Sequence, residues 1–303
     1  MVEGQEGVSW EQWLALAHAC EQAGISAMFR SDHYLNLEGG HPERGSLDAW
    51  ATIAGLAAVT SRLRLGTLVS PATFRHPSTL AKMVSTADHI SGGRIELGIG
   101  AGWNEREHQA YGFEFPPTRA RIEILQEQLE VIHRSWAPDP SSFEGAHYRL
   151  RELNAQPKPI QQPHPPLIIG GSGGPRSVAL AARYADEYNT VFPTPEQAVA
   201  RRGRLVEACE QAGRDPIPLS VMTNVTVAAG DAELRDRVRR LGEWIGRDAE
   251  TLLRDPPAGW LIGTIDRVAE QLAALERAGV SRIMCQHLLH EDIDAVALLA
   301  RLG

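Results

Sequence analysis

Cysteine is scarce in this sequence, and its placement argues against two classes of protein. Cys20, Cys209 and Cys285 are far apart and make no Cys-x-x-Cys pair, so we expect neither a disulfide framework nor a cysteine-based zinc site. This usage fits a reduced, cytoplasmic location. The N-terminus also lacks the basic segment and short apolar run of a secretory leader.

Clusters of basic residues and long apolar runs are missing as well. The formal net charge is −8, and acidic and basic residues are interspersed along the chain, whereas a nucleic-acid partner needs grouped Lys and Arg. No segment approaches the roughly 20 apolar residues of a membrane span. We therefore expect a small-molecule substrate as the partner, with no nucleic acid and no membrane.

Strand-like and helix-like segments alternate through most of the 303 residues, which predicts a parallel sheet with helical crossovers. The expected strands are 25–29, 62–69, 94–99, 167–169, 189–192, 219–227 and 282–285. The expected helices are 10–23, 47–59, 76–90, 119–136, 176–185, 196–212, 232–254, 265–278 and one that starts at 292.

This alternation indicates an α/β fold of the (β/α)₈ TIM-barrel type, because such barrels accommodate chains of this length as one domain. Seven strands follow the first helix, so an eighth must precede it, where only residues 1–3 are available. We expect that first strand to be very short or truncated. We take 1–303 as one domain, with a proline-rich insertion at 138–166 after the fourth βα unit.

Polar side chains follow the strand at 25–29, at the end where barrel enzymes carry their functional groups. Asp32 and His33 supply a carboxylate and a group that titrates near neutral pH, a pair suited to proton transfer. A structural pair that only holds the loop in place is the alternative interpretation.

Glycine-rich segments follow two later strands. Gly98, Gly100 and Gly102 allow a flat ligand to approach the backbone closely, although they do not form a dinucleotide fingerprint. The segment 170–176 combines consecutive backbone N–H groups, a helix start and Arg176, an arrangement suited to a phosphate. It lacks the Lys-Ser/Thr of a P-loop, and a flexible or packing-driven turn is the alternative at both places.

The C-terminal segment has a composition that resembles a metal site. It contains His287, His290, Glu291, Asp292 and Asp294, but two histidines at a loop-to-helix junction are few, and acidic residues there also cap a helix. We therefore expect no metal.

Taken together, the motifs resemble the luciferase-like monooxygenase superfamily, and within it the branch of oxidoreductases that depend on the deazaflavin coenzyme F420. The similarity extends over almost the whole chain from Gly4, and the ordered set of motifs is more specific than any one of them. The motifs are Phe29-Arg30-Ser31-Asp32-His33-Tyr34, Leu65-Gly66-Thr67-Leu68-Val69-Ser70-Pro71, Phe74-Arg75-His76-Pro77, Ser91-Gly92-Gly93-Arg94, Gly98-Ile99-Gly100-Ala101-Gly102-Trp103-Asn104-Glu105, Ile169-Gly170-Gly171 and Ala181-Ala182-Arg183-Tyr184-Ala185-Asp186.

The resemblance implies that the deazaflavin binds at the mouth of the barrel, with His33 near the reactive ring carbon and Asp32 orienting His33 or contacting the cofactor. The peptide Leu68–Val69 matches a non-prolyl cis bond of relatives, which makes a bulge behind the ring. Further positions match or adjoin cofactor contacts, namely Ser70, Ala101, Gly102, Asn104, Gly170, Gly171, Gly173, Gly174 and Arg176.

The resemblance also bears on the substrate. Sugar-phosphate dehydrogenases of this branch carry a glutamate in the glycine-rich segment where this chain has Trp103. A flatter, more apolar surface favours a hydrophobic substrate, and we expect the segment 143–148 of the insertion to help cover the mouth. The predicted activity is hydride transfer between F420 and such a substrate, with His33 as acid and base.

Three other functions remain open at this point. The same barrel serves flavin mononucleotide (FMN), so an FMN-dependent monooxygenase that uses oxygen is the main alternative. A protein that binds the cofactor without turnover and a metal-dependent barrel hydrolase are the others, although the hydrolase would need a His-x-His that is missing after the early strands. A homodimer is expected only by analogy with relatives.

Overall fold

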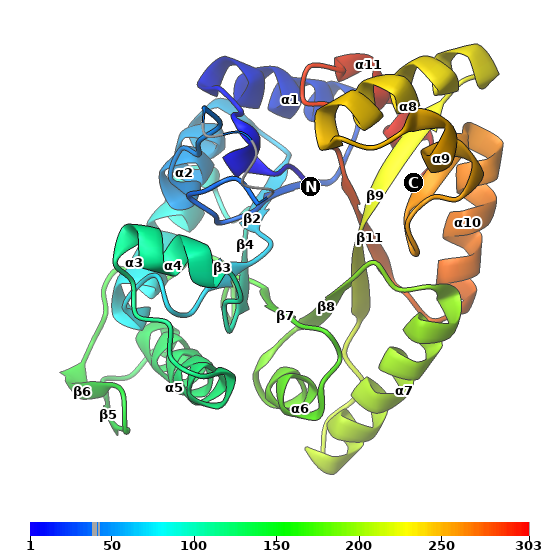
Figure 1. The fold of residues 1–303 in the computed structure, drawn as a ribbon. Helices are drawn as coiled ribbons and strands as arrows, with labels where there is room; N and C mark the ends of the chain where they lie inside the picture. Colours follow the sequence, from blue (N-terminus) through cyan, green and yellow to red (C-terminus); the bar gives the residue numbers. More distant parts are fainter. Residues whose placement is uncertain (38–40, 42, 303) are drawn as a thin grey trace.

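Eight segments of the chain form a closed barrel of parallel strands (Figure 1). The computed structural model describes residues 1–37, 41 and 43–302. Seven of the segments are strands in the order β1 (Ala27–Arg30), β2 (Arg64–Thr67), β4 (Ile95–Gly100), β7 (Leu167–Gly170), β8 (Glu187–Val191), β9 (Leu219–Ala228) and β11 (Arg282–Gln286).

Residues 1–3 close the barrel between β1 and β11. The backbone N–H of Val2 donates to the carbonyl of Phe29 at 2.9 Å, and the N–H of His287 donates to the carbonyl of Met1 at 2.9 Å. The predicted (β/α)₈ barrel with a very short first strand is therefore confirmed.

Helices surround the barrel in Figure 1, and local capping explains several of their ends. Ser9 and Gln12 form the capping box of the first helix, whose last turn ends at Gly24 in the left-handed conformation. The helices around the barrel are α1 (Trp10–Ala23), α2 (Ala49–Val59), α3 (Pro77–Ser91), α5 (Thr118–Trp136), α6 (Pro175–Tyr184), α7 (Pro195–Gln211), α8 (Asp231–Ile245), α10 (Ile265–Arg277) and α11 (Ile293–Leu299).

Several short elements differ from the sequence prediction. The expected helix 232–254 is two helices, α8 and α9 (Ala249–Arg254), because Gly246 adopts the left-handed conformation (φ +67°) that ends α8. The short elements that the prediction missed are α4 (Glu105–Tyr111), β3 (Ser70–Pro71), β10 (Leu261–Thr264), which extends beside the second half of β9, and the 3₁₀ turns η1 (Gly4–Glu6) and η2 (Ala300–Leu302).

The insertion forms an antiparallel hairpin, β5 (Ser141–Glu144) and β6 (Arg149–Leu153), outside the ring of helices. The carboxylate of Glu127 on α5 accepts the backbone N–H groups of Ala146, His147 and Tyr148 at 2.7–3.0 Å. The hairpin is therefore fixed to the outer face of α5.

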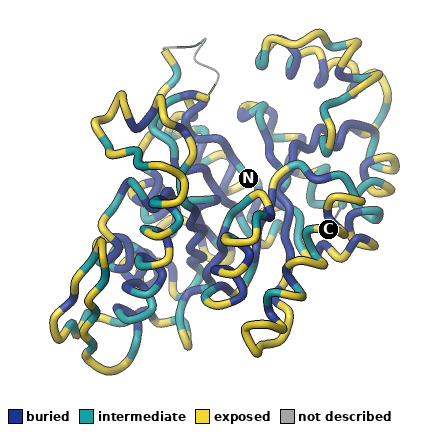
Figure 2. The backbone as a smooth tube through the Cα atoms, turned by 60° about the horizontal axis from the view of Figure 1, so that its bottom comes forward, coloured by how far each residue is buried: buried dark blue, intermediate teal, exposed yellow. Residues whose placement is uncertain are grey.

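The barrel strands are mostly buried, whereas exposed positions lie mainly on the outer helices and loops (Figure 2). Phe29, Leu68, Ile168, Met222 and Met284 pack together in one apolar cluster. Near the start of the strands, Glu96 binds Arg64 and Arg282 at 2.6 and 2.7 Å. This end of the barrel interior is therefore filled by an ion-pair cluster.

Candidate active site

One large cavity of about 1120 Å³ lies at the carboxyl ends of the strands, where enzymes with this barrel carry their active sites. The predicted site residues that line it are His33, Leu68, Val69, Ala101, Gly102, Gly170, Gly171, Gly174 and Arg176. The predicted residues that are not part of its lining are Asp32, Ser70, Asn104 and Gly173. The structure thus brings together segments that are up to about 140 positions apart in the sequence.

Val69 forms part of the cavity wall beside two glycines. The Leu68–Val69 peptide bond is cis, as the resemblance implied. A Cβ atom on Gly100 would lie 2.8 Å from Val69 Cγ2, and one on Gly170 would lie 2.9 Å from Val69 Cγ1. Both positions therefore require glycine while Val69 stays in place, and the bare backbone leaves room for a flat ligand.

His33 lies at the cavity wall, and a residue from α4 binds it. Its Nδ1 is 2.8 Å from Oε2 of Glu107, whose side chain is fully buried. The other carboxylate oxygen of Glu107 accepts the backbone N–H groups of Tyr34 and Leu35. Burial of the imidazole opposes its charge, but the bond to Glu107 and nearby carboxylates outweigh burial, so the pKa of His33 is raised.

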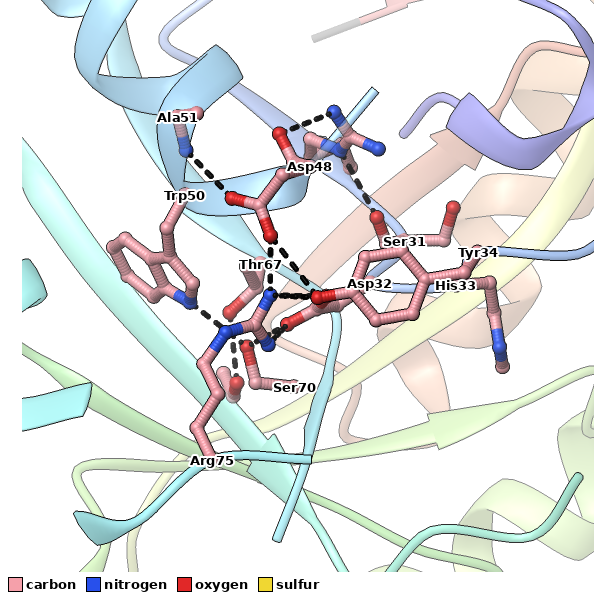
Figure 3. Close-up of polar contacts among 12 residues, drawn as sticks. Ser31, Asp32, His33, Tyr34, Asp48, Trp50, Ala51, Thr67, Ser70 and Arg75 are labelled. Atoms are coloured by element: carbon pink, nitrogen blue, oxygen red, sulfur yellow. Dashed lines mark hydrogen bonds and ion pairs between the residues drawn. The ribbon is translucent and has the colours of Figure 1, made fainter. Parts of the chain in front are cut away.

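Asp32 points away from His33, toward Arg75 and Ser70 (Figure 3). Arg75 binds both oxygens of the Asp32 carboxylate, at 2.6 and 3.1 Å, and Ser70 Oγ donates to it at 2.6 Å. Arg75 also binds Asp48 at 2.8 Å. Asp32 and His33 are adjacent in sequence but contact different groups. Within the described part of the chain, no hydrogen bond from Asp32 orients the His33 ring.

Asn104 begins α4. Its side chain accepts the N–H of Glu107 at the helix start, so it caps the helix that carries the partner of His33. Sequence reasoning missed Glu107, although Asn104-x-x-Glu107 has the spacing of a helix-capping pair and could have indicated a helix here. No local signal gives the contact with His33, because 74 positions separate the two residues.

The glycine loop (residues 170–176) leads into α6 beside the cavity. Two of its amides are used within the protein: Gly171 N–H donates to the Asn189 carbonyl at 3.0 Å, and Gly173 N–H donates to the Tyr188 hydroxyl at 2.8 Å. The amides of the first turn of α6 have no acceptor within the helix, and Arg176 lines the cavity beside them. Fewer loop amides are therefore open to an anion than the sequence predicted, and the phosphate site at the start of α6 stays a prediction.

Three tryptophans and an arginine line the cavity, and the insertion does not. Trp103 is 64% exposed, and its ring meets the His33 ring edge to face at a centroid distance of 5.6 Å. Trp244, Arg247 and Trp260 line the cavity from the C-terminal half. The expectation that segment 143–148 covers the mouth is wrong, because no described residue of 138–166 lines the cavity and Glu127 holds the hairpin on α5.

A buried polar group lies on the wall opposite the glycine loop. The Glu3 carboxylate accepts the side-chain amides of Gln5 at 2.8 Å and Gln286 at 2.7 Å. Ser31 joins this group through Gln5. Sequence reasoning did not single out these residues, which lie at opposite ends of the chain and meet only because the barrel closes.

The comparison with known protein families decides the class. The family model described as luciferase-like monooxygenase matches residues 2–282. The chain belongs to the luciferase-like monooxygenase family. The family and the oxidoreductase class predicted from the motifs are thereby confirmed.

The names of similar sequences give different activities, or none. The uncharacterised protein Rv0953c of Mycobacterium tuberculosis is 32% identical over 225 residues, which are 70% of this chain and 78% of that protein. The F420-dependent hydroxymycolic acid dehydrogenase of M. tuberculosis is 30% identical over 242 residues, 80% of this chain and 65% of that protein. Pyrimidine monooxygenase RutA of Pseudomonas syringae pv. syringae is 35% identical over 178 residues, 56% of this chain and 48% of RutA.

Solved structures confirm the luciferase-like barrel. An F420-dependent secondary alcohol dehydrogenase, determined with an F420-acetone adduct, superimposes with a TM-score of 0.80 at 19% identity and covers 100% of this chain and 98% of its own. The oxygenating constituent of 3,6-diketocamphane monooxygenase from Pseudomonas putida, determined with FMN, has a TM-score of 0.75 at 21% identity and covers 96% and 91%. At these identities the likeness concerns the fold alone.

Two further observations concern this luciferase-like chain. Within the described residues, no three side chains of His, Cys, Asp or Glu come together as a metal ion would need, and Asp292 binds Arg237 and Arg240 instead. No helix in the described ranges combines the length and the apolar character needed to cross a membrane.

Proposed function

We propose that this chain transfers hydride between the deazaflavin coenzyme F420 and a small organic substrate with an apolar body, and that His33 exchanges the substrate proton. The observation that carries the proposal is the cavity itself, in which the Val69 surface, the start of α6 and His33 face one space. The name of the dehydrogenase from M. tuberculosis that shares 30% identity over 80% of this chain supports F420 as the cofactor.

The residues present fit a planar cofactor with a phosphate. Gly100 and Gly170 lack the Cβ atoms that would displace Val69, so a ring system can lie on this surface. The first turn of α6 and Arg176 would hold the phosphate through backbone N–H groups and positive charge. When bound, the deazaflavin supplies the hydride chemistry.

The chain itself then has three tasks. His33 takes up or returns the substrate proton, for which a histidine with a raised pKa is suited near neutral pH. Trp103, Trp244 and Trp260 give the cavity an aromatic surface that favours an apolar substrate and displaces water from it. Asp32 supports the wall through Arg75, so we propose a structural role for it in place of proton transfer.

An FMN-dependent monooxygenase that uses reduced flavin and oxygen is the second candidate. The similarity to RutA, at 35% identity over 56% of this chain, favours it, and an anion site at α6 accepts the phosphate of FMN equally well.

Titration of the purified protein with each cofactor distinguishes the two candidates. We expect F420 to bind with a micromolar or lower Kd and FMN to bind at least tenfold more weakly. Tight binding of FMN alone would overturn the assignment. A substrate screen with the cofactor-loaded protein then tests turnover. His33→Ala should keep cofactor binding while kcat falls by about 10²–10⁴-fold. Cofactor binding with no turnover of any substrate would support the alternative of a protein that binds the cofactor without turnover.

The cytoplasmic location expected from cysteine usage and the homodimer expected by analogy with relatives both stay predictions. Light scattering of the purified protein tests the second, with twice the mass of the 33.1 kDa chain as the expected result.

A further inference from the structure

Glu107 makes more contacts with the His33 segment than its place on a short surface helix would suggest. One carboxylate oxygen lies 2.8 Å from His33 Nδ1, and the other accepts the backbone N–H groups of the next two residues, Tyr34 and Leu35. The Glu107 side chain is fully buried, whereas His33 lines the cavity. One side chain therefore fixes both the ring of His33 and the backbone that follows it.

We propose that Glu107 is the positioning residue of the site, which holds the proton of neutral His33 on Nδ1 and leaves Nε2 as the atom that exchanges a proton with the substrate. The value of this arrangement for turnover rests on the proposed function. The coupling between Glu107 and His33 is a property of the chain alone.

The hydrogen-bonding capacity of each group leads to this arrangement. An ionised carboxylate only accepts hydrogen bonds, so Nδ1 at 2.8 Å must carry a hydrogen whether the ring is neutral or charged. The neutral ring then has its lone pair on Nε2. Because the amides of Tyr34 and Leu35 hold the other oxygen, the carboxylate cannot turn away from the ring.

The charges around His33 support the same assignment. Burial disfavours the imidazolium, while Glu107 from α4, Glu3 from the N-terminal segment and Asp32 from the end of β1 all favour it. Although burial also favours the neutral acid, the bonds from His33 and the two amides lower the pKa of Glu107. Glu107 thus stays an acceptor throughout the range in which His33 titrates.

The substitution Glu107→Gln separates positioning of the ring from support of the loop. A glutamine oxygen still accepts the amides of Tyr34 and Leu35, so a purely structural role would survive. The glutamine NH₂ group would then face Nδ1, which has to become an acceptor and shift the proton to Nε2. A substitution that reverses the histidine tautomer in this way impairs proton transfer strongly in enzymes with a histidine base.

The decisive measurement is the ¹⁵N NMR titration of His33 in the protein without cofactor, with the signal assigned by its loss in His33→Gln. In the wild type we expect the Nδ1–H tautomer above the pKa, and a pKa above 6.5, the ordinary value for histidine. In Glu107→Gln we expect the Nε2–H tautomer and a pKa lower than in the wild type, because only Glu3 and Asp32 then oppose the effect of burial. Glu107→Asp should restore the acceptor and part of the shift.

Glu21→Gln is the matched control. The Glu21 carboxylate accepts three successive backbone N–H groups, those of Ser61, Arg62 and Leu63, and among the residues that the structure describes it has no bond to a histidine. This variant should leave the tautomer and the pKa of His33 unchanged. It therefore reports what the loss of a loop-holding carboxylate does by itself.

The outcomes separate this proposal from the proposed function. An Nε2–H tautomer in the wild type, or the same tautomer and pKa in wild type and Glu107→Gln, would overturn it, and the first of these results needs no variant that must fold. In the loaded enzyme, Glu107→Gln should lower kcat about 10²-fold or more with little change in KM. Failure to bind F420 would remove the proposed function and leave the NMR result intact.

Discussion

Asp32 and Arg75 form a bidentate ion pair behind the cavity wall, with Nη1 at 2.6 Å from one carboxylate oxygen and Nη2 at 3.1 Å from the other. Both side chains are buried, with exposed fractions of 1% and 10%. His33 faces the cavity, while Asp32 faces this ion pair. The Asp-His motif thus serves two separate purposes.

Asp32→Asn should destabilise the protein, while His33 keeps its hydrogen bond to Glu107 and therefore its tautomer. Removing one member of a buried ion pair costs about 3–5 kcal/mol, reduced here because Asp48 still binds Arg75. Urea denaturation measures the loss, with Asp215→Asn, the same change at an exposed aspartate, as the control that should change stability little. Equal stability of the two variants, together with loss of turnover in Asp32→Asn, would show that Asp32 acts in the chemistry.

The barrel could be predicted from the sequence because the spacing of apolar residues within a long segment indicates whether that segment is a helix or a strand. The short elements were missed because they carry little periodicity: α4 has seven residues and β10 has four. Gly246, inside the expected helix 232–254, is a residue type that commonly ends helices. The chain turns there, and Trp244 and Arg247 on either side of the turn line the cavity.

The candidate site was predicted less completely, because its partnerships are made across the fold. His33, Val69 and the glycine loop could be predicted because they follow predicted strands, and residues that follow the strands of such a barrel meet at its mouth. The contacts His33–Glu107 and Glu3–Gln286 join residues 74 and 283 positions apart. The position of the insertion was wrongly predicted for the same reason, because the bonds from Glu127 to the turn of its hairpin also join residues that are distant in sequence.

Gly100→Ala should weaken cofactor binding. The added Cβ would lie 2.8 Å from Val69 Cγ2, so Val69 has to move into the space that we assign to the ring. We expect an increase in Kd of about tenfold or more, measured by titration. Val69→Ala in the same chain should recover most of the loss, and independent effects of the two substitutions would contradict the packing argument.

Arg176→Ala should raise the Kd of either phosphorylated cofactor. A charge-assisted hydrogen bond contributes about 1.5–3 kcal/mol, which corresponds to roughly a tenfold or larger change, and the effect should shrink as salt increases. Arg183→Ala, at the other end of α6, is the control and should leave Kd unchanged. Equal effects of the two substitutions would place the phosphate elsewhere.

Two buried histidines near the C-terminus should make the protein sensitive to acid. Burial lowers the pKa of His287 to about 4 and that of His290 to about 3, while both titrate near 6.5 in the unfolded chain. Between about pH 6.5 and pH 4.5 the unfolded state therefore binds protons that the folded state does not, and stability falls as pH falls, by at most about 1.4 kcal/mol per pH unit for each histidine.

His33 does not add to this slope, because its raised pKa gives a contribution that is complete below pH 6.5 and is lost as pH rises through the folded-state pKa. Urea denaturation at several pH values measures the slope. It should become shallower in His287→Gln, and an unchanged slope in that variant would show that His287 is not the group responsible.

The central claim is that one ring system lies on the Val69 surface within reach of His33, with its phosphate at the start of α6. A crystal structure of the protein with F420 tests it most directly. We predict the ring against Val69, Gly100 and Gly170, the phosphate at Arg176, and His33 Nε2 facing the ring. A ring bound outside this cavity, or bound with His33 on the far side from it, would contradict the account.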